Sequence, residues 1–372
     1  MKRAVFVLVA FFVGLHSCKT DFEVNAPWKD ITVVYGLLDQ NENGKQHSLN
    51  ESGKVHIIKI NKAFLGKADA NDMAAIADSS EYGPEEITAE IQRSKNGGPP
   101  DQTYVLTRFV DPNKPSGTFY SGDQVLYKFS DSLLPGYDYT LVVTNTKTKK
   151  KVLAKTQIVQ DFKFASGGFW NAPTPKVSFF NNGSYEKFDK VFWKTAVNGR
   201  RYQLTVRFHY REKDFNKSGN PETEKTLDWT FASVQSQDLN GGDEIGREIN
   251  GEDFYKYIAT QLEPFSLATN NVIRCVGTLD FIVSAAGEDF NTYLEVNEPS
   301  TGIVQERPEY TNVFDENGSE QAGFFSSRYS IIEEGAKLGQ SGLTNSLSEL
   351  KSGIYTGNHG FATAPVSTCP AY

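Results

Sequence analysis

The stretch LLPGYDYTLVV at residues 133–143 indicates the secondary structure that dominates this chain. The Pro-Gly pair at residues 135–136 favours a tight turn. After the turn, bulky residues recur at a period of two, which places them on one face of an extended strand. The residues of that face are Tyr137, Tyr139, Leu141 and Val143. The pattern therefore predicts a strand with one buried face.

Similar short runs, separated by turn residues, continue on both sides of this stretch. Those that predict strands in the N-terminal half are 31–38, 55–60, 87–92, 104–109, 124–129, 137–144 and 151–159. Seven such runs are typical of a β-sandwich. The last two, joined by a lysine-rich turn, resemble the final strand pair of fibronectin-type-III and related immunoglobulin-like modules. We therefore expect residues 30–162 to form an immunoglobulin-like β-sandwich, in which 61–80 adds a crossover loop with a short helix.

A change of composition at residues 165–175, rich in Gly, Pro and aromatic residues, marks the expected domain boundary. Strand-like runs then resume at 177–180, 190–194, 202–211, 226–233 and 278–285. Helical signals also appear: Asn250 can cap a helix over 251–262, residues 290–294 fit a second helix, and Ser346-x-x-Glu349 matches a capping box for a third. The fold class we predict is mainly β, with a second β-rich α+β domain over residues 175–372.

The N-terminus has the order of a secretory signal peptide. Lys2 and Arg3 precede an apolar run of about ten residues, which is shorter than the roughly 20 that a membrane-spanning helix needs. The run ends in Leu15-His16-Ser17-Cys18, which resembles the lipobox of bacterial lipoproteins, although His16 departs from the usual small residue. We expect cleavage after residue 17 and acylation of Cys18. The alternative is an ordinary signal peptide followed by an incidental cysteine.

Residues 18–29 then form a short polar tether, whose charged start resembles the export signals of surface lipoproteins of the Bacteroidota. Two or three acyl chains hold a protein firmly at a bilayer, whereas one does not. The predicted location is the outer membrane, lipid-anchored, facing either the periplasm or the cell surface.

Composition narrows the classes of partner. The formal net charge of the 372 residues is -8, and removal of residues 1–17, with Lys2 and Arg3, moves it to -10. An acidic chain without basic clusters argues against nucleic acid as a partner. The many aromatic residues and glycines, 26 Phe, 17 Tyr and 31 Gly, favour strands and turns over helices.

Two cysteines remain after Cys18, namely Cys275 and Cys369. In an exported protein a disulfide between them can persist, and it would tie the C-terminal tail to a strand. The alternative is a buried thiol at Cys275 and an exposed one at Cys369. Asp131-Ser132-Leu133 resembles the acceptor tripeptide for O-glycosylation in exported Bacteroidota proteins, which makes Ser132 a candidate site; the same residues also suit a turn.

No pattern for catalysis or for a cofactor is found. The histidines His47, His56, His209 and His359 have no metal-ligand spacing, and no nucleophile elbow, phosphate loop or Cys-x-x-Cys pair occurs. His209 lies on the polar side of its predicted strand, as a surface residue. Residues 39–44 and 214–219 resemble the start of a calcium loop, but Asn50 and Lys225 stand where the bidentate glutamate should be. We therefore predict no metal and no catalytic residues.

The order of these features resembles an uncharacterised family of Bacteroidota lipoproteins, a domain of unknown function often encoded beside TonB-dependent receptors. The resemblance rests on Ile31–Leu37, His56–Ile60, Phe254–Tyr257, Tyr310–Val313 and Gly323–Arg328. The turn at residues 315–320 is longer and more acidic than the family pattern. The resemblance implies a non-catalytic accessory binding protein for an outer-membrane TonB-dependent nutrient transporter. The alternatives are a structural or adhesive surface protein and a surface hydrolase.

Overall fold

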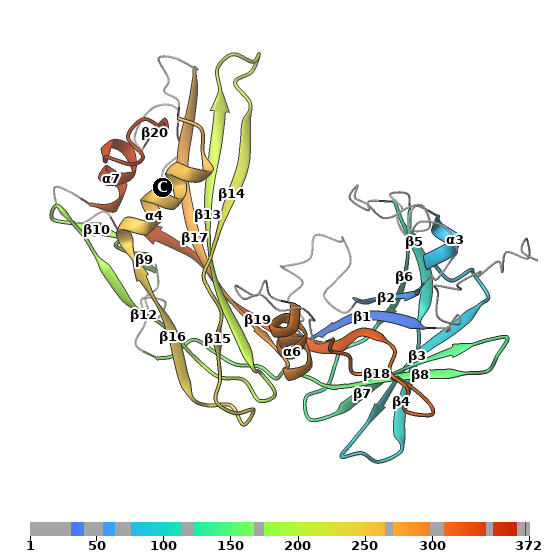
Figure 1. Ribbon diagram of the computed structural model, residues 1–372. Coiled ribbons are helices and arrows are strands. Elements are labelled where there is room, and N and C mark those ends of the chain that lie inside the picture. The colour runs from blue at the N-terminus through green and yellow to red at the C-terminus, as the bar shows by residue number, and fades with distance from the viewer. Residues whose placement is uncertain are drawn as a thin grey trace, which may run out of the picture.

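The chain is built mainly of strands, as the sequence predicts, and folds into two lobes joined by a common sheet (Figure 1). The computed structural model describes residues 31–40, 55–63, 76–112, 123–166, 175–264, 271–297, 309–339, 345–362 and 369. The predicted signal peptide, Cys18 and the tether lie outside the described residues.

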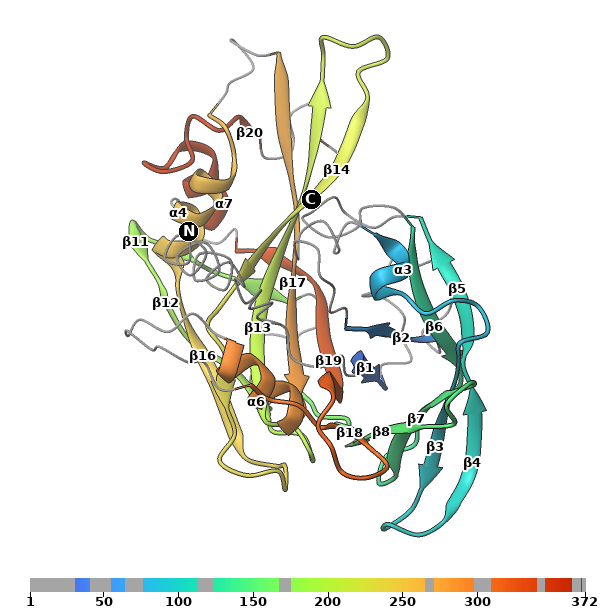
Figure 2. The ribbon, with the colours of Figure 1, turned by 45° about the vertical axis from the view of Figure 1, so that its right-hand side comes forward.

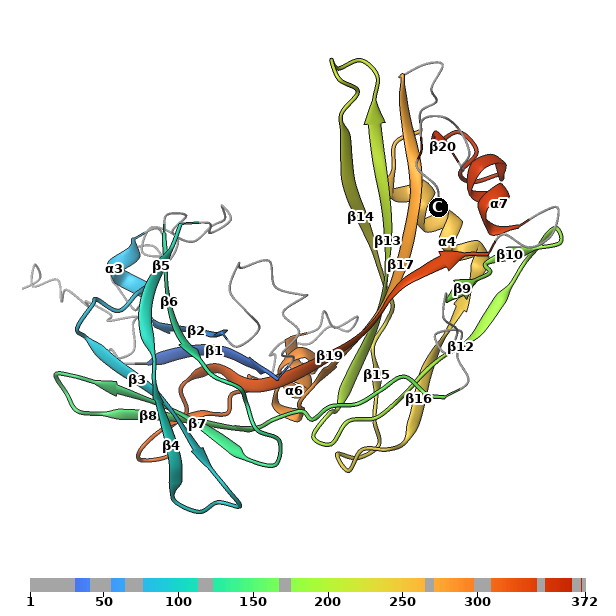
Figure 3. The ribbon, with the colours of Figure 1, turned by 180° about the vertical axis from the view of Figure 1, so that it is seen from behind.

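The largest sheet runs through both lobes. Its path is β14 (Glu222–Thr230), β13 (Arg201–Asp214), β17 (Val272–Ala286), β19 (Ala322–Leu338), β1 (Thr32–Asp39), β2 (Val55–Lys62), β6 (Gln124–Ser130) and β5 (Thr107–Asp111). The 17-residue strand β19 belongs to both lobes, because its first half pairs in parallel with β1 and its second half pairs antiparallel with β17. Figure 3 shows this strand passing from one lobe into the other.

The first lobe is a β-sandwich. Its second sheet has the order β18 (Val313–Asp315), β8 (Lys151–Gln157), β7 (Asp138–Asn145), β3 (Ile87–Ser94) and β4 (Pro100–Val105). Both sheets supply apolar side chains to one core, such as Ile58 and Tyr127 from the long sheet and Ile91 and Leu141 from the other. The short helix α3 (Ala77–Ser80) falls in the predicted crossover segment. An immunoglobulin-like strand order remains a prediction.

Two predicted strands are wrong. Residues 177–180 are divided between β9 (Lys176–Val177) and β10 (Phe180–Asn181), which pair with different strands. Residues 104–109 are not a single strand, because β4 ends at Val105 in one sheet and β5 begins at Thr107 in the other. Leu106 lies between them with its side chain buried and its backbone N–H bound to the Ala89 carbonyl, 2.9 Å away. The chain therefore changes sheets at the residue that enters the core.

The second lobe packs helices against one face of the long sheet. α4 (Gly251–Gln261), α7 (Ser346–Ser352) and the pair β12 (Lys187–Lys194) and β16 (Glu244–Asn250) lie on the side away from the first lobe (Figure 2). Leu204, Val206 and Phe208 of β13 face them and are fully buried or nearly so. Short strands complete the lobe: β9 (Lys176–Val177), β10 (Phe180–Asn181), β11 (Ser184–Tyr185), β15 (Val234–Gln235) and β20 (Phe361–Ala362).

The helix signals locate the helices, with one correction. Asn250 caps α4 by accepting a hydrogen bond from the Glu252 N–H, as predicted. The capping box of α7 is formed by Asn345 and Ser348, and not by Ser346 and Glu349. Ser346 is fully buried, and its hydroxyl oxygen accepts the N–H groups of Phe179 and Phe180 at 2.9 and 3.1 Å. Its side chain is therefore already engaged in tertiary contacts.

The lobes do not divide at a single point of the sequence. Val159 and Phe162, at the end of the segment expected to form the first domain, already pack in the second core. Val313 and Phe325, from the segment expected to form the second domain, complete the first core. The expected boundary before residue 175 thus separates stretches of chain, while β18 and β19 return to the first lobe.

A buried serine joins the two lobes. The Ser327 hydroxyl donates to the Gln157 carbonyl at 2.7 Å and accepts the Val159 N–H at 2.8 Å. α6 (Glu288–Asn297) lies against β19 at the joint, where Phe290 and Tyr293 pack on Phe324 with ring centroids 5.1 and 4.4 Å apart (Figure 1). The joint is thus held by both hydrogen bonds and packing.

Candidate functional site

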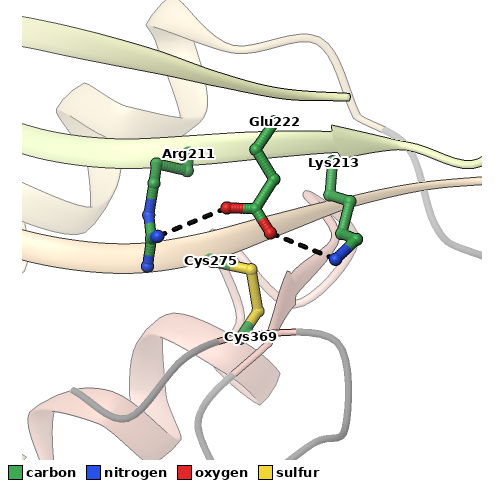
Figure 4. Close-up of a disulfide and its surroundings, with 5 residues drawn as sticks. All are labelled: Arg211, Lys213, Glu222, Cys275 and Cys369. Carbon is green, nitrogen blue, oxygen red and sulfur yellow. Dashed lines mark hydrogen bonds and ion pairs between the residues drawn. A yellow bond between two sulfur atoms is a disulfide. The ribbon is translucent and has the colours of Figure 1, made fainter. Parts of the chain in front are cut away.

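The two cysteines of the body form a disulfide. Cys275 on β17 is bonded to Cys369, 94 residues later, with the Cα atoms 5.5 Å apart. β20 also pairs in parallel with β17 at Arg274 and Cys275, so the tail is held by two adjacent contacts. Figure 4 shows the disulfide beside Arg211, Lys213 and Glu222, whose side chains form ion pairs of 3.3 and 3.1 Å.

The other predicted site residues lie apart from this disulfide. Ser132 occupies the connection between β6 and β7, half-buried, and its N–H donates to the Asp131 carboxylate at 2.6 Å. The Asp131 carbonyl accepts the Nε2–H of buried His56 at 3.0 Å, and Leu133 is in the core. Modification of Ser132 stays a prediction. The lipid acceptor Cys18 lies outside the described residues.

The loop at 214–219, considered for calcium, has an explanation as a turn. The Asp214 carboxylate accepts the Asn216 N–H at 2.9 Å and pairs with Lys217 at 3.3 Å, while Gly219 has a positive φ of 81°. These contacts are those of an Asx turn at the end of a hairpin. The part of the other loop that follows residue 40 lies outside the described residues.

The candidate site lies on the open face of the second lobe, which is the side of the long sheet that bears His209 and lies opposite α4, α7, β12 and β16. Here the long sheet contains two neighbouring β-bulges. Phe208 pairs with Leu279 and Tyr210 with Val276, so Gly277 and Thr278 lie opposite the single residue His209. A side chain at Gly277 would collide with the His209 carbonyl, which explains the glycine. Bulges interrupt the ladder and redirect side chains, and they are common next to binding and active sites.

The second bulge lies one strand further on. Glu334 and Gly335 of β19 oppose Asp280 of β17, and Gly335 has a φ of 76°. Its N–H donates to Asp280 Oδ1 at 2.9 Å, while Asp280 Oδ2 lies 2.6 Å from His209 Nε2. The three groups form a chain of hydrogen bonds across three strands, which fixes the imidazole ring in place.

The first bulge opens a hollow of about 680 Å³ in this face. Its lining includes His209, Arg211, Glu224, Lys225, Thr226 and Thr278. Most charges around it are paired: Arg207 with Asp228 at 2.7 Å, Arg211 with Glu222, and Lys225 with Glu212, while Glu224 has no ion pair among the described residues. The Arg207 guanidinium, by its hydrogen bonds, lowers the pKa of Asp228. The hollow is therefore polar and close to neutral.

No protein-family model matches the chain, and no curated protein matches it.

A second, smaller hollow of about 270 Å³ lies at the joint of the lobes. Asp138 and Lys155 of the first lobe and Glu288 and Asp289 of α6 line it. Asp138 pairs with Lys155 at 3.1 Å. Burial raises the pKa of Asp289, whose carboxylate accepts the Tyr310 hydroxyl at 2.7 Å. Because Asp138 and Asp289 each already have a hydrogen-bonding partner, we interpret this hollow as part of the joint.

Sequence reasoning placed His209 on the surface but missed its partner. The imidazole is indeed on the outward face, with 38% of its side chain exposed, yet Asp280 lies 71 residues away along the chain. Pairing over that distance depends on strand order, which local patterns do not encode. The usable signal was the isolated glycines at 277 and 335, because a glycine inside a strand often marks a bulge.

Proposed function

We propose that this chain is a lipid-anchored outer-membrane lipoprotein that binds a ligand without transforming it, as an accessory to a TonB-dependent nutrient transporter. The observation that most supports an anchored body acting as one unit is the sharing of β19 by both lobes. One continuous sheet makes the body a single unit, so that an anchor on either lobe positions the whole open face.

The anchor would be joined to the long sheet at β1, which is one of its inner strands. Thirteen residues separate Cys18 from Thr32, where β1 begins. Fully extended, they span roughly 45 Å, which is the farthest that β1 can lie from the acylated residue. Among the described residues, no helix is long and apolar enough to cross a membrane. Attachment in this proposal therefore depends on acylation of Cys18.

Two measurements test the anchor. Metabolic labelling with a tagged fatty acid should label the native chain and leave Cys18→Ser unlabelled and soluble. A native chain without label, together with a Cys18→Ser chain that still sediments with envelopes, would contradict the anchor. Protease treatment of intact cells then distinguishes the cell surface, where the body is cut, from the periplasm, where it is protected.

The accessory role has its own test. The native lipoprotein, isolated from gently solubilised outer membranes, should bring a TonB-dependent transporter with it. The Cys18→Ser chain, added after solubilisation, is the matched control for binding that occurs only after lysis. Recovery of no transporter would instead favour a structural or adhesive surface protein, the alternative that the sequence leaves open.

A further inference from the structure

We propose that the hollow around His209 binds a neutral oligosaccharide. The inference rests on the proposed function only in treating the chain as a binding protein, since the site itself is independent of the anchor. The argument uses four properties of the hollow: its fixed imidazole, its hydrogen-bonding groups, its charge and its size.

The hydrogen-bond chain determines which ring nitrogen of His209 carries the proton. An ionised carboxylate accepts hydrogen bonds and does not donate them, so Nε2 must donate to Asp280. In the neutral imidazole, Nδ1 is then an acceptor. Asp280 is itself oriented by the Gly335 N–H. The neutral ring therefore presents the Nδ1 lone pair in a preset direction, and no described residue hydrogen-bonds to Nδ1.

The neighbouring groups extend this arrangement across three strands. Thr226 of β14 pairs with His209 of β13, and Thr278 of β17 lies on the other side, with strands about 4.8 Å apart. Glu224 is next to Thr226 on the same face, opposite Arg211. The side chains of Glu224, Thr226 and Thr278 have no hydrogen-bond partner among the described residues. They offer acceptors and hydroxyls at intervals suited to a ligand with many hydroxyl groups.

Charge and polarity exclude the other ligand classes. An anion would meet the Glu224 carboxylate and a cation would meet the Arg211 guanidinium, so neither sign is favoured. An apolar ligand finds no apolar wall, because the Tyr210 side chain is buried in the core on the other side of the sheet. Pockets that hold small ligands span about 300–1,000 Å³. A hollow of about 680 Å³ is large enough for several sugar units.

The test uses the complete mature chain with Cys18→Ser, so that it stays in solution. Neutral hexasaccharides of glucose, mannose and xylose, in α and β linkages, are titrated to millimolar concentration while the imidazole nitrogen NMR signals are recorded. At least one should shift the His209 signal and leave those of the buried His56 and His359 unchanged. A hexamer of galacturonic acid and one of glucosamine serve as anionic and cationic controls and should bind more weakly.

Variants test whether the shift of the His209 signal results from binding in the hollow. Thr226→Val should weaken binding about tenfold because it removes a hydrogen bond to the ligand, and Glu224→Gln should weaken it because it replaces an ionised acceptor by a weaker neutral one. Thr205→Val, on the same strand and face as His209 but outside the hollow, should bind normally. Asp280→Asn should move the proton of His209 to Nδ1, because the Asn oxygen keeps the Gly335 N–H and its amide then donates to Nε2. The tautomer change is visible in the NMR spectrum without ligand.

Three results would overturn the proposal: no neutral hexasaccharide shifts His209, a charged hexamer binds more tightly, or Thr205→Val weakens binding as much as Thr226→Val. Binding by the neutral sugar with release of shorter products would keep the site but contradict the proposed non-catalytic function. Conversely, an absent fatty-acid label would contradict the anchor and leave this binding unaffected.

Discussion

The two lobes complete their cores in different ways. In the first lobe, residues 31–158 supply most of a sandwich core. Val313 and Phe325, which lie more than 150 residues later in the sequence, complete it. The Thr32 N–H even binds the side chain of Gln321, 289 residues later. The second lobe closes with helices and a covalent link between Cys275 and Cys369. The first lobe therefore depends on long-range pairing, and the second also on a disulfide.

The shared strand β19 couples the stability of one lobe to that of the other. A perturbation of the first half of β19 loosens the β1 pairing, and a perturbation of the second half loosens the β17 pairing. We expect the two lobes to unfold in one cooperative step. Separate transitions after a change in one lobe would contradict this coupling.

The largest effect is expected in the first lobe, from Phe325→Ala. Phe325 is fully buried, and Phe-to-Ala changes in cores typically lower the free energy of unfolding by about 3–5 kcal/mol. Calorimetry should show one transition at a lower temperature. Phe314→Ala is the matched control, because Phe314 lies on β18, the strand that precedes β19 in the chain, with 38% exposure, and a change within about 0.5 kcal/mol is expected.

Removal of the disulfide tests the second lobe. Replacement of Cys275 and Cys369 by serine frees a loop of 94 residues, and loss of such a link typically costs about 2–4 kcal/mol. Calorimetry of the double variant should show a lowered midpoint, and a reducing agent should lower that of the native chain in the same way. An unchanged midpoint would mean that β20 and the α7 packing hold the tail by themselves.

Strand positions could be predicted well because alternation is a local signal. The run expected at 124–129 is β6 at Gln124–Ser130, and that at 87–92 is β3 at Ile87–Ser94. The break at Leu106 was missed because both flanking strands are extended and only the partner sheet changes. The return of β18 and β19 to the first lobe leaves no local signal, since any strand with one apolar face fits either core.

The candidate site was less predictable than the fold. A bond between the two cysteines could be expected from their number and the exported context, without evidence from spacing. The hydrogen-bond chain from His209 to Asp280 and Gly335 requires two bulges in register across three strands. Sequence alone indicates such bulges only by glycines inside strands, which also have other causes.

A smaller effect concerns the attachment of α7, where two adjacent residues have different roles. Ser346→Ala leaves two buried N–H groups without their acceptor, which costs about 1–3 kcal/mol. Asn345→Ala removes the helix cap, which costs typically about 1 kcal/mol. Urea unfolding of both variants should therefore find Ser346→Ala the less stable. The opposite order would show that the cap, and not the tertiary hydrogen bond, fixes this helix.

The smallest effect is a dependence on pH that reports on each lobe separately. Burial lowers the pKa of His56 in the first lobe and of His359 in the second, and the Arg274 guanidinium lowers that of His359 further. The unfolded histidines, with pKa near 6.5, then bind more protons than the folded ones, so stability falls as the pH drops below about 6.5. Each histidine contributes at most about 1.4 kcal/mol per pH unit to the slope of the free energy of unfolding against pH.

His56→Gln and His359→Gln each remove one of these contributions. Urea unfolding, measured from neutral pH down to the pH at which carboxylates begin to titrate, should therefore show a smaller slope for either variant. A slope that only one variant reduces would mean that acid acts on a single lobe.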